Sequence, residues 1–329
     1  MIKTCRRKAL IRTQRDKRLE GTTKASSTIK LTLVAALVAS VVAPGTAAAE
    51  DPAFVPWSEL APGLTTEYDP SSSNLCNRGD TRCVDAVITE MRRRFNPLAK
   101  SCNHNAVFAL TYLRTTEEYR RTINDPTFFK DTPFVNHEDA VFASYYFQAY
   151  DNWYKKAQRG RVAPAWKIAF TAADNHGVSG TGSLLLGMSA HINRDLPFVL
   201  AAIGLVDPQG DSRKGDHDKV NKFLNRVTES VIEETSRRFD PRISDASIKA
   251  TTADETGLFQ LVAGWRERAW RNAERLVAAR TSQERQLVAD SIEQAALLDA
   301  RYLEAETAYH PPLTSSSARD AYCAVHWND

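Results

Sequence analysis

Residues 182–206 read GSLLLGMSAHINRDLPFVLAAIGLV. Apolar side chains lie on every side of the helix that this sequence predicts, which is typical of a helix buried inside a protein. The length would also suit a membrane span, but His191, Arg194 and Asp195 lie in its middle, and such a cluster is costly in lipid. We therefore predict that this segment is the core helix of a soluble helical bundle.

Pro197 lies near the centre of the same helix. Proline has no N–H group to donate to the carbonyl of Asn193, so that carbonyl is left free and the helix should kink there. The sequence therefore predicts a buried, Pro-kinked central helix.

Most of the remaining chain has the same helical periodicity. Apolar residues recur at helical spacing, whereas the alternation typical of strands is scarce. The further predicted helices span residues 85–95, 105–121, 139–158, 164–173, 216–239, 256–279 and 282–309. We predict an all-α fold, a single-domain bundle of about seven to eight helices over residues 75–309.

The N-terminal region is typical of an export signal. A basic segment precedes an apolar core at residues 31–44, which is too short to span a bilayer comfortably, and Ala47-Ala48-Ala49 fits the rule for signal peptidase. We predict a signal peptide over residues 1–49 and a secreted, extracellular protein without stable membrane insertion after cleavage. Residues 50–74 are rich in Pro and Ser, so we predict an extended N-terminal lead-in there. We predict that residues 310–329 form a C-terminal tail, because two prolines end the preceding helix.

The cysteines agree with export. Cys5 leaves with the signal, and an even set of four in an exported protein predicts two disulfides. Cys76 and Cys83 bracket a turn-rich loop, so their local pairing is the simplest arrangement. Cys102 would then pair with Cys323 and tether the C-terminal tail.

The charge is unevenly distributed. Residues 1–49 hold ten Lys and Arg against two acidic residues, whereas the rest of the chain holds 33 Lys and Arg against 38 Asp and Glu. Phosphate binding needs a basic surface, so this mildly acidic body argues against nucleic acid as a partner. We predict an unknown small molecule or an envelope component as the partner.

His191 and Asp195 are the most informative pair. They are four residues apart and therefore share one face of the central helix, where an unpaired buried charge would be expensive. Three interpretations stay open. Asp195 orients His191 as a general base, both residues ligate a divalent metal such as zinc, or the pair is a structural polar cluster.

Other helices offer candidate partners for this pair. His104, Asp139 and Asp216 lie where helices are predicted to begin, and acidic residues there often only cap the helix. If those helix starts converge at one end of the bundle, the three side chains face His191 and Asp195 and complete a metal site.

A family resemblance rests on the same helix. The sequence GMSAHINRDLP, residues 187–197, resembles the signature G-M-x-A-H-I-N-x-D-L-P of an uncharacterised bacterial family, common in actinobacteria, that is labelled a domain of unknown function. The resemblance extends over roughly residues 84–280 and implies an all-α fold, but it implies no reaction. Looser matches lie at residues 139–143 and 164–166 and at Asp216, Val220, Asn221, Trp270 and Ala273.

Two functional hypotheses follow. The first is a secreted all-α enzyme, a metal-dependent hydrolase with His191 and Asp195 as ligands or as base and orienting group. The second is a non-catalytic secreted binding or envelope-associated protein, in which the buried His–Asp cluster only fixes the packing.

Overall fold

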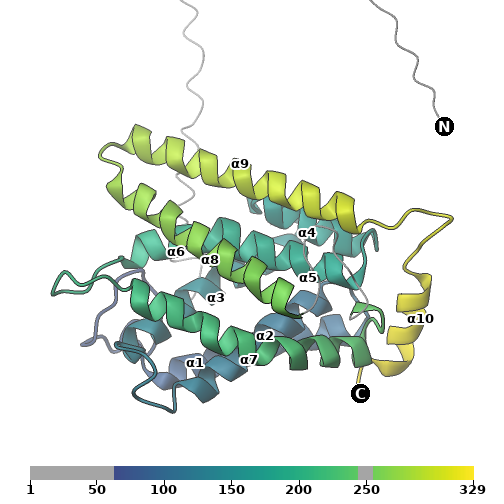
Figure 1. Ribbon diagram of the computed structural model, residues 1–329, viewed down its shortest axis with the longest axis horizontal. Helices are drawn as coiled ribbons and strands as arrows, with labels where there is room; N and C mark the ends of the chain where they lie inside the picture. The colour runs from purple at the N-terminus through teal and green to yellow at the C-terminus, as the bar shows by residue number, and fades with distance from the viewer. Residues whose placement is uncertain (1–62, 244–254) are drawn as a thin grey trace, which may run out of the picture. The chain divides into compact units, whose positions relative to one another are not determined.

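The computed structural model describes residues 63–243 and 255–329 (Figure 1). Within these ranges the chain forms ten α-helices and no strand, which confirms the predicted all-α fold. The predicted signal peptide lies outside the described residues. The helices are α1 (Thr81–Lys100), α2 (Ala106–Thr122), α3 (Thr132–Tyr154), α4 (Pro164–Asp174), α5 (Gly180–Ser189), α6 (Leu196–Ile203), α7 (Lys214–Arg238), α8 (Glu255–Ala278), α9 (Ser282–Thr307) and α10 (Ser317–His326), with a 3-10 helix η3 (Lys156–Arg161).

The central helix is built differently from the prediction. A π-helical segment, η4 (Ala190–Asp195), joins α5 to α6, and the N–H of Leu196 donates to the carbonyl of His191. Pro197 then occupies the first turn of α6, where a missing N–H costs least. The disturbance expected from Pro197 is thus taken up by a π-helical turn, a feature that is frequent at functional sites.

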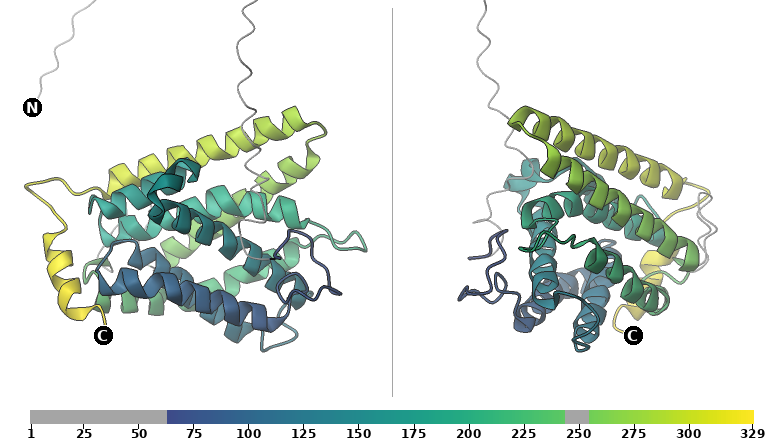
Figure 2. Two further views of the ribbon diagram at one scale, coloured as in Figure 1. Left: turned by 180° about the vertical axis from the view of Figure 1, so that it is seen from behind. Right: turned by 60° about the vertical axis from the view of Figure 1, so that its left-hand side comes forward.

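The other helices surround this central element (Figures 1 and 2). Helices α8 and α9 pack against each other, α9 also contacts α4 and α5, and α8 contacts α6 and η4. Helix α2 packs against α1, α5 and α7. The approach of α2 depends on Gly187, because a Cβ atom there would lie 2.4 Å from the ring of Phe108.

Helix α3 begins earlier than its sequence suggests. Asp131 is the N-cap and accepts a hydrogen bond from the N–H of Phe134, and Pro133 follows in the first turn. The predicted start at Asp139 is therefore wrong by seven residues. Asp139 lies two turns inside α3 and is free from any capping role.

The C-terminal region is tied to the bundle. The structure pairs Cys76 with Cys83 and Cys102 with Cys323, which are the two predicted disulfides. The second bond holds α10, a helix that lies within the segment predicted as a tail. None of the described helices is long and apolar enough to cross a lipid bilayer.

Candidate functional site

His191 and Asp195 contact each other inside the bundle. His191 Nδ1 lies 3.0 Å from Asp195 Oδ2, and the two side chains are almost fully buried. The other contacts of Asp195 come from Trp166, whose Nε1 donates to Oδ2 at 2.8 Å, and from Arg194, whose Nη1 donates to Oδ1 at 2.9 Å. Arg194 is itself paired with Glu293. The buried carboxylate is thus compensated on both oxygens, as a buried charge requires.

His191 is held as a neutral base. Burial lowers its pKa, against the opposing hydrogen bond to Asp195. The carboxylate of Asp195 accepts hydrogen bonds, so Nδ1 of His191 carries the proton and Nε2 keeps its lone pair. The ring of Phe142 stacks on the imidazole at 3.6 Å between centroids and fixes its plane. No described residue hydrogen bonds to Nε2, although this atom is buried.

A cavity of about 120 Å³ adjoins His191. Its walls come from α2, α3, α7, α8 and the central helix and are mainly apolar and aromatic. Three further buried polar atoms on its lining residues lack a hydrogen-bond partner among the described residues: Tyr112 Oη, Asp139 Oδ2 and Arg266 Nε. Buried polar groups in native proteins are rarely left unpaired, so a cavity with four such atoms is a candidate binding site.

Two adjacent acidic residues of α3 line this cavity, and the pKa of each is raised. Burial raises the pKa of Glu138 to about 7, and burial together with the neighbouring Glu138 raises the pKa of Asp139 to about 8. Asp139 therefore holds a proton at neutral pH and can donate a hydrogen bond into the cavity. Perturbed carboxylic acids in a pocket are typical of acid–base sites.

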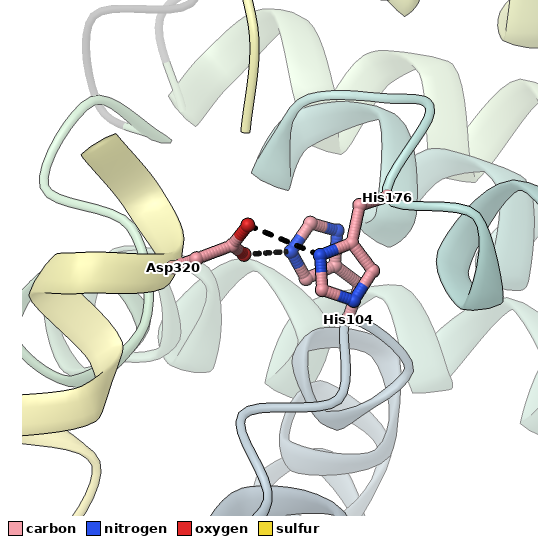
Figure 3. A group of neighbouring side chains, drawn as sticks. All are labelled: His104, His176 and Asp320. Carbon is pink, nitrogen blue, oxygen red and sulfur yellow. Dashed lines mark hydrogen bonds and ion pairs between the residues drawn. The ribbon is translucent and has the colours of Figure 1, made fainter. Parts of the chain in front are cut away.

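A second histidine group lies beside α10 (Figure 3). His104 Nε2 is 2.7 Å and His176 Nδ1 is 3.1 Å from the carboxylate of Asp320, and the two rings stack at 4.1 Å between centroids. Among the described residues, these three side chains form the group whose ligand atoms lie close enough together to hold one metal ion.

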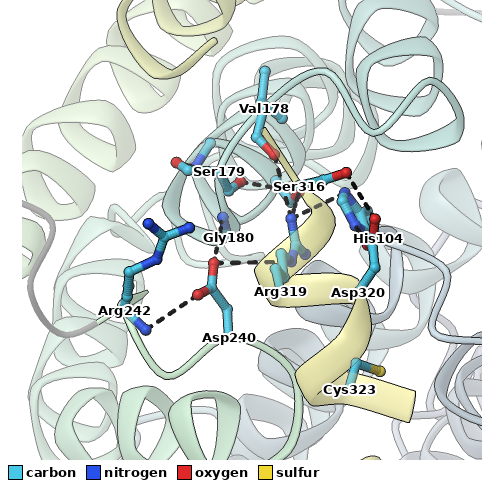
Figure 4. Close-up of polar contacts among 12 residues, drawn as sticks. His104, Val178, Ser179, Gly180, Asp240, Arg242, Ser316, Arg319, Asp320 and Cys323 are labelled. Atoms are coloured by element: carbon cyan, nitrogen blue, oxygen red, sulfur yellow. Dashed lines mark hydrogen bonds and ion pairs between the residues drawn. The ribbon is translucent and has the colours of Figure 1, made fainter. Parts of the chain in front are cut away.

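Arg319 contacts His104 of that group and determines which of its ring nitrogens carries the proton (Figure 4). Its Nη1 lies 3.0 Å from His104 Nδ1, and a guanidinium can only donate, so His104 Nε2 carries the proton and donates to Asp320. Burial and the charge of Arg319 lower the pKa of His104 to about 3, against the hydrogen bond to Asp320. A metal on Nε2 would have to displace this proton and would leave an N–H facing Arg319, whereas ligating histidines normally face an acceptor there.

The five residues predicted as metal ligands thus fall into three places. His191 and Asp195 contact each other, and Asp139 lines the same cavity. His104 belongs to the group beside α10. Asp216 accepts hydrogen bonds from the backbone N–H groups of Lys130 and Asp131, so it anchors the start of α3 instead.

Sequence reasoning missed several members of both groups. The sequence predicts Tyr112 only as an apolar residue of its helix and Trp166 only as part of the family match. Nothing in their spacing shows that the Tyr112 ring lies against His191 or that Trp166 Nε1 donates to Asp195. His176 and Asp320 are 144 residues apart, and only the folded chain brings them together.

Comparison with curated proteins finds no match, and comparison with solved structures finds none either. A family model matches residues 84–306, which include the central helix and the His191 cavity but not α10. The chain belongs to this family, a family of unknown function (DUF5995).

Proposed function

We propose that the protein is a hydrolase that binds a small, uncharged ester or related carbonyl compound in the cavity beside the central helix. The observation that carries this proposal is His191 Nε2, a buried and oriented lone pair without a partner at the edge of that cavity. A structural histidine would be expected to have both nitrogens satisfied.

The proposed chemistry is general base catalysis. His191 Nε2 takes a proton from water as the water oxygen bonds to the carbonyl carbon, and Asp195 stabilises the imidazolium that forms. The electron pair of the C=O bond moves to its oxygen, where the Asp139 carboxyl and the Tyr112 hydroxyl offer hydrogen bonds. The intermediate then expels an alcohol, which takes the proton back from His191.

Metal-assisted hydrolysis at the same place is the competing form of this proposal. Catalytic zinc is usually held by three protein ligands. Both oxygens of Asp195 already accept hydrogen bonds, and the cavity adds only Asp139 and Glu138 to His191 as donors of the kind zinc prefers. Among the described residues, these three side chains do not bring their ligand atoms close enough together to hold one ion, which favours the base mechanism.

We also propose that the protein acts outside the cell. Two disulfides are typical of exported proteins, because reducing compartments keep thiols free. This location fits the signal peptide predicted over residues 1–49.

Hydrolysis of nitrophenyl esters of short carboxylic acids tests the proposal. We expect His191→Ala to lower kcat/KM by about 10²- to 10⁴-fold, the usual contribution of a general base. His310→Ala, at an exposed histidine, is the matched control and should keep full activity. A chelator should have no effect if the base mechanism holds and should abolish activity if a metal is used.

The alternative function makes the opposite prediction. If the protein is a non-catalytic binding or envelope-associated protein, purified protein hydrolyses none of these esters, and His191→Ala changes only the free energy of unfolding. Retention of esterase activity in a folded His191→Ala protein would also overturn the proposed role of His191.

A further inference from the structure

The His191 cavity continues toward α7 and α8. A smaller cavity of about 40 Å³ shares five lining residues with it, and the remaining walls of this inner cavity are largely apolar. Met188 is one of the five residues that line both spaces. An unbranched thioether side chain adapts its shape easily, so Met188 is a poor barrier to a ligand that spans both cavities. The inner cavity is also lined by Val227, Val231, Ile232, Leu258 and Phe259.

On the opposite side, the His191 cavity meets a polar one. An outer cavity of about 200 Å³ shares only Val135 and Glu138 with it. The cations of this outer cavity are paired with acids: Lys130 with Asp207, Arg213 with Asp131, and Lys219 with Asp216. The outer cavity is therefore polar without a free positive charge to attract an anion.

The three spaces have a clear order of polarity. The outer cavity is polar, the His191 cavity has aromatic walls with four unpartnered polar atoms, and the inner cavity is apolar. A molecule that matches this order carries its polar group near His191 and an apolar chain toward α7 and α8.

Three ionisable residues besides His191 bear on the charge of that polar group. Arg266 is the cation on the lining of the cavity, and the charge of Glu138 opposes it. Glu138 and Asp139 line the His191 cavity, and burial makes each of them resist ionisation. A ligand carboxylate placed beside them would bring a further charge into the same low-dielectric space, and the desolvation of that charge is unfavourable. An uncharged ester can instead accept a hydrogen bond from Tyr112 or Asp139, and a hydroxyl can both accept from them and donate to His191 Nε2.

We propose that the substrate is an uncharged, single-chain amphiphile, with an ester group beside His191 and a straight alkyl chain that extends past Met188 into the inner cavity. This inference rests on the proposed function for the identity of the ester as the reacting group. The choice of a straight alkyl chain rests on the cavities alone.

Straight-chain primary alcohols, from butanol to decanol, test the chain preference without any reaction. Binding is measured by calorimetry on the full-length protein. Each methylene that enters the inner cavity should lower Kd by about fourfold, which corresponds to roughly 0.8 kcal/mol. Octanoate should bind at least about tenfold more weakly than octanol at neutral pH, because its charge would have to be desolvated beside Glu138 and Asp139.

Variants of α7 identify the cavity that is used. Thr228→Leu places a larger side chain in the inner cavity, so it should weaken binding of octanol and decanol by about tenfold or more and leave butanol unchanged. Ile232→Phe gives the same test if Thr228→Leu folds poorly. Glu229→Leu, on the exposed side of the same helix, is the matched control and should bind like the unmodified protein.

The inference is overturned if no alcohol binds, if Kd does not depend on chain length, or if Thr228→Leu and Ile232→Phe both bind decanol normally. Alcohols are not hydrolysed, so these outcomes are independent of the role of His191. If the protein hydrolyses no ester but its Kd for alcohols still depends on chain length, the proposed reaction is refuted and the proposed class of ligand still holds.

Discussion

The two buried histidines that contact aspartates, His191 and His104, have opposite surroundings. His104 uses both ring nitrogens, one with Asp320 and one with Arg319. His191 uses only Nδ1, and its Nε2 is left without a partner beside a cavity. The first histidine lies in a saturated network that holds a terminal helix, whereas the second has unused hydrogen-bonding capacity next to space for a ligand.

The comparison shows that a His–Asp contact alone does not define a functional site. The group at His104, His176 and Asp320 has the spacing of metal ligands, yet the proton of His104 is already placed by Arg319. The pair at His191 lacks a full ligand set, yet it keeps a free lone pair. Unused hydrogen-bonding capacity next to a cavity is therefore the better indicator of chemistry.

The largest effect is expected from the removal of Arg319. Its guanidinium lies 3.8 Å from Asp240, and both side chains are almost fully buried. Arg319→Met leaves Asp240 without this compensation and His104 Nδ1 without a donor, so we expect a loss of about 3–5 kcal/mol in the free energy of unfolding. Chemical denaturation measures this loss.

Arg237→Met is the matched control for that experiment, because Arg237 is exposed on α7. It should change the free energy of unfolding by less than about 0.5 kcal/mol. If Arg319→Met lowers the free energy of unfolding no more than this control does, Arg319 is not needed to satisfy Asp240 and His104. The contrast with His191 then fails.

The next effect is expected from pH, and for a change of one pH unit it is smaller than that of Arg319→Met. The pKa of His104 is lowered in the folded protein to about 3, from 6.5 in an exposed histidine. Between these values the unfolded chain binds a proton that the folded chain does not, so stability should fall as pH decreases, by up to about 1.4 kcal/mol per pH unit. Asp320 continues the loss below about pH 4, because hydrogen bonds from Ser316, His104 and His176 outweigh burial and lower its pKa to about 2.

His104→Asn isolates this contribution. Asparagine does not titrate, so the slope of unfolding free energy against pH should become shallower between pH 6.5 and 3. His310→Ala should leave the slope unchanged, since His310 is exposed. An identical slope in His104→Asn and the unmodified protein would contradict the assigned protonation of His104.

The sequence predicted more of the fold than of the site. Helical periodicity and the buried segment at residues 182–206 were sufficient for the all-α architecture, because periodicity reports directly on which faces are buried. The start of α3 was misplaced, since the capping geometry of Asp131 depends on a local turn that periodicity does not reveal.

The candidate site could be predicted only where it is local. His191 and Asp195 are four residues apart on one helix, so their contact follows from helix geometry. Asp139 shares the cavity because α3 packs near the central helix, and neither its position nor that of Tyr112 follows from spacing along the chain. The separation of His104 and Asp216 from His191 likewise depends on tertiary packing.

The smallest effect is expected from zinc. The group at His104, His176 and Asp320 is the described site whose spacing suits a metal, but binding there must displace the proton on His104 Nε2 and turn an N–H toward Arg319. We expect zinc at tens of micromolar to raise the free energy of unfolding by no more than about 0.5 kcal/mol. His176→Ala removes a half-exposed ligand and should abolish even this increase. A large stabilisation that His176→Ala eliminates would reverse the comparison, because Arg319 would then have to yield to the metal, and the group beside α10 would become the stronger candidate for chemistry.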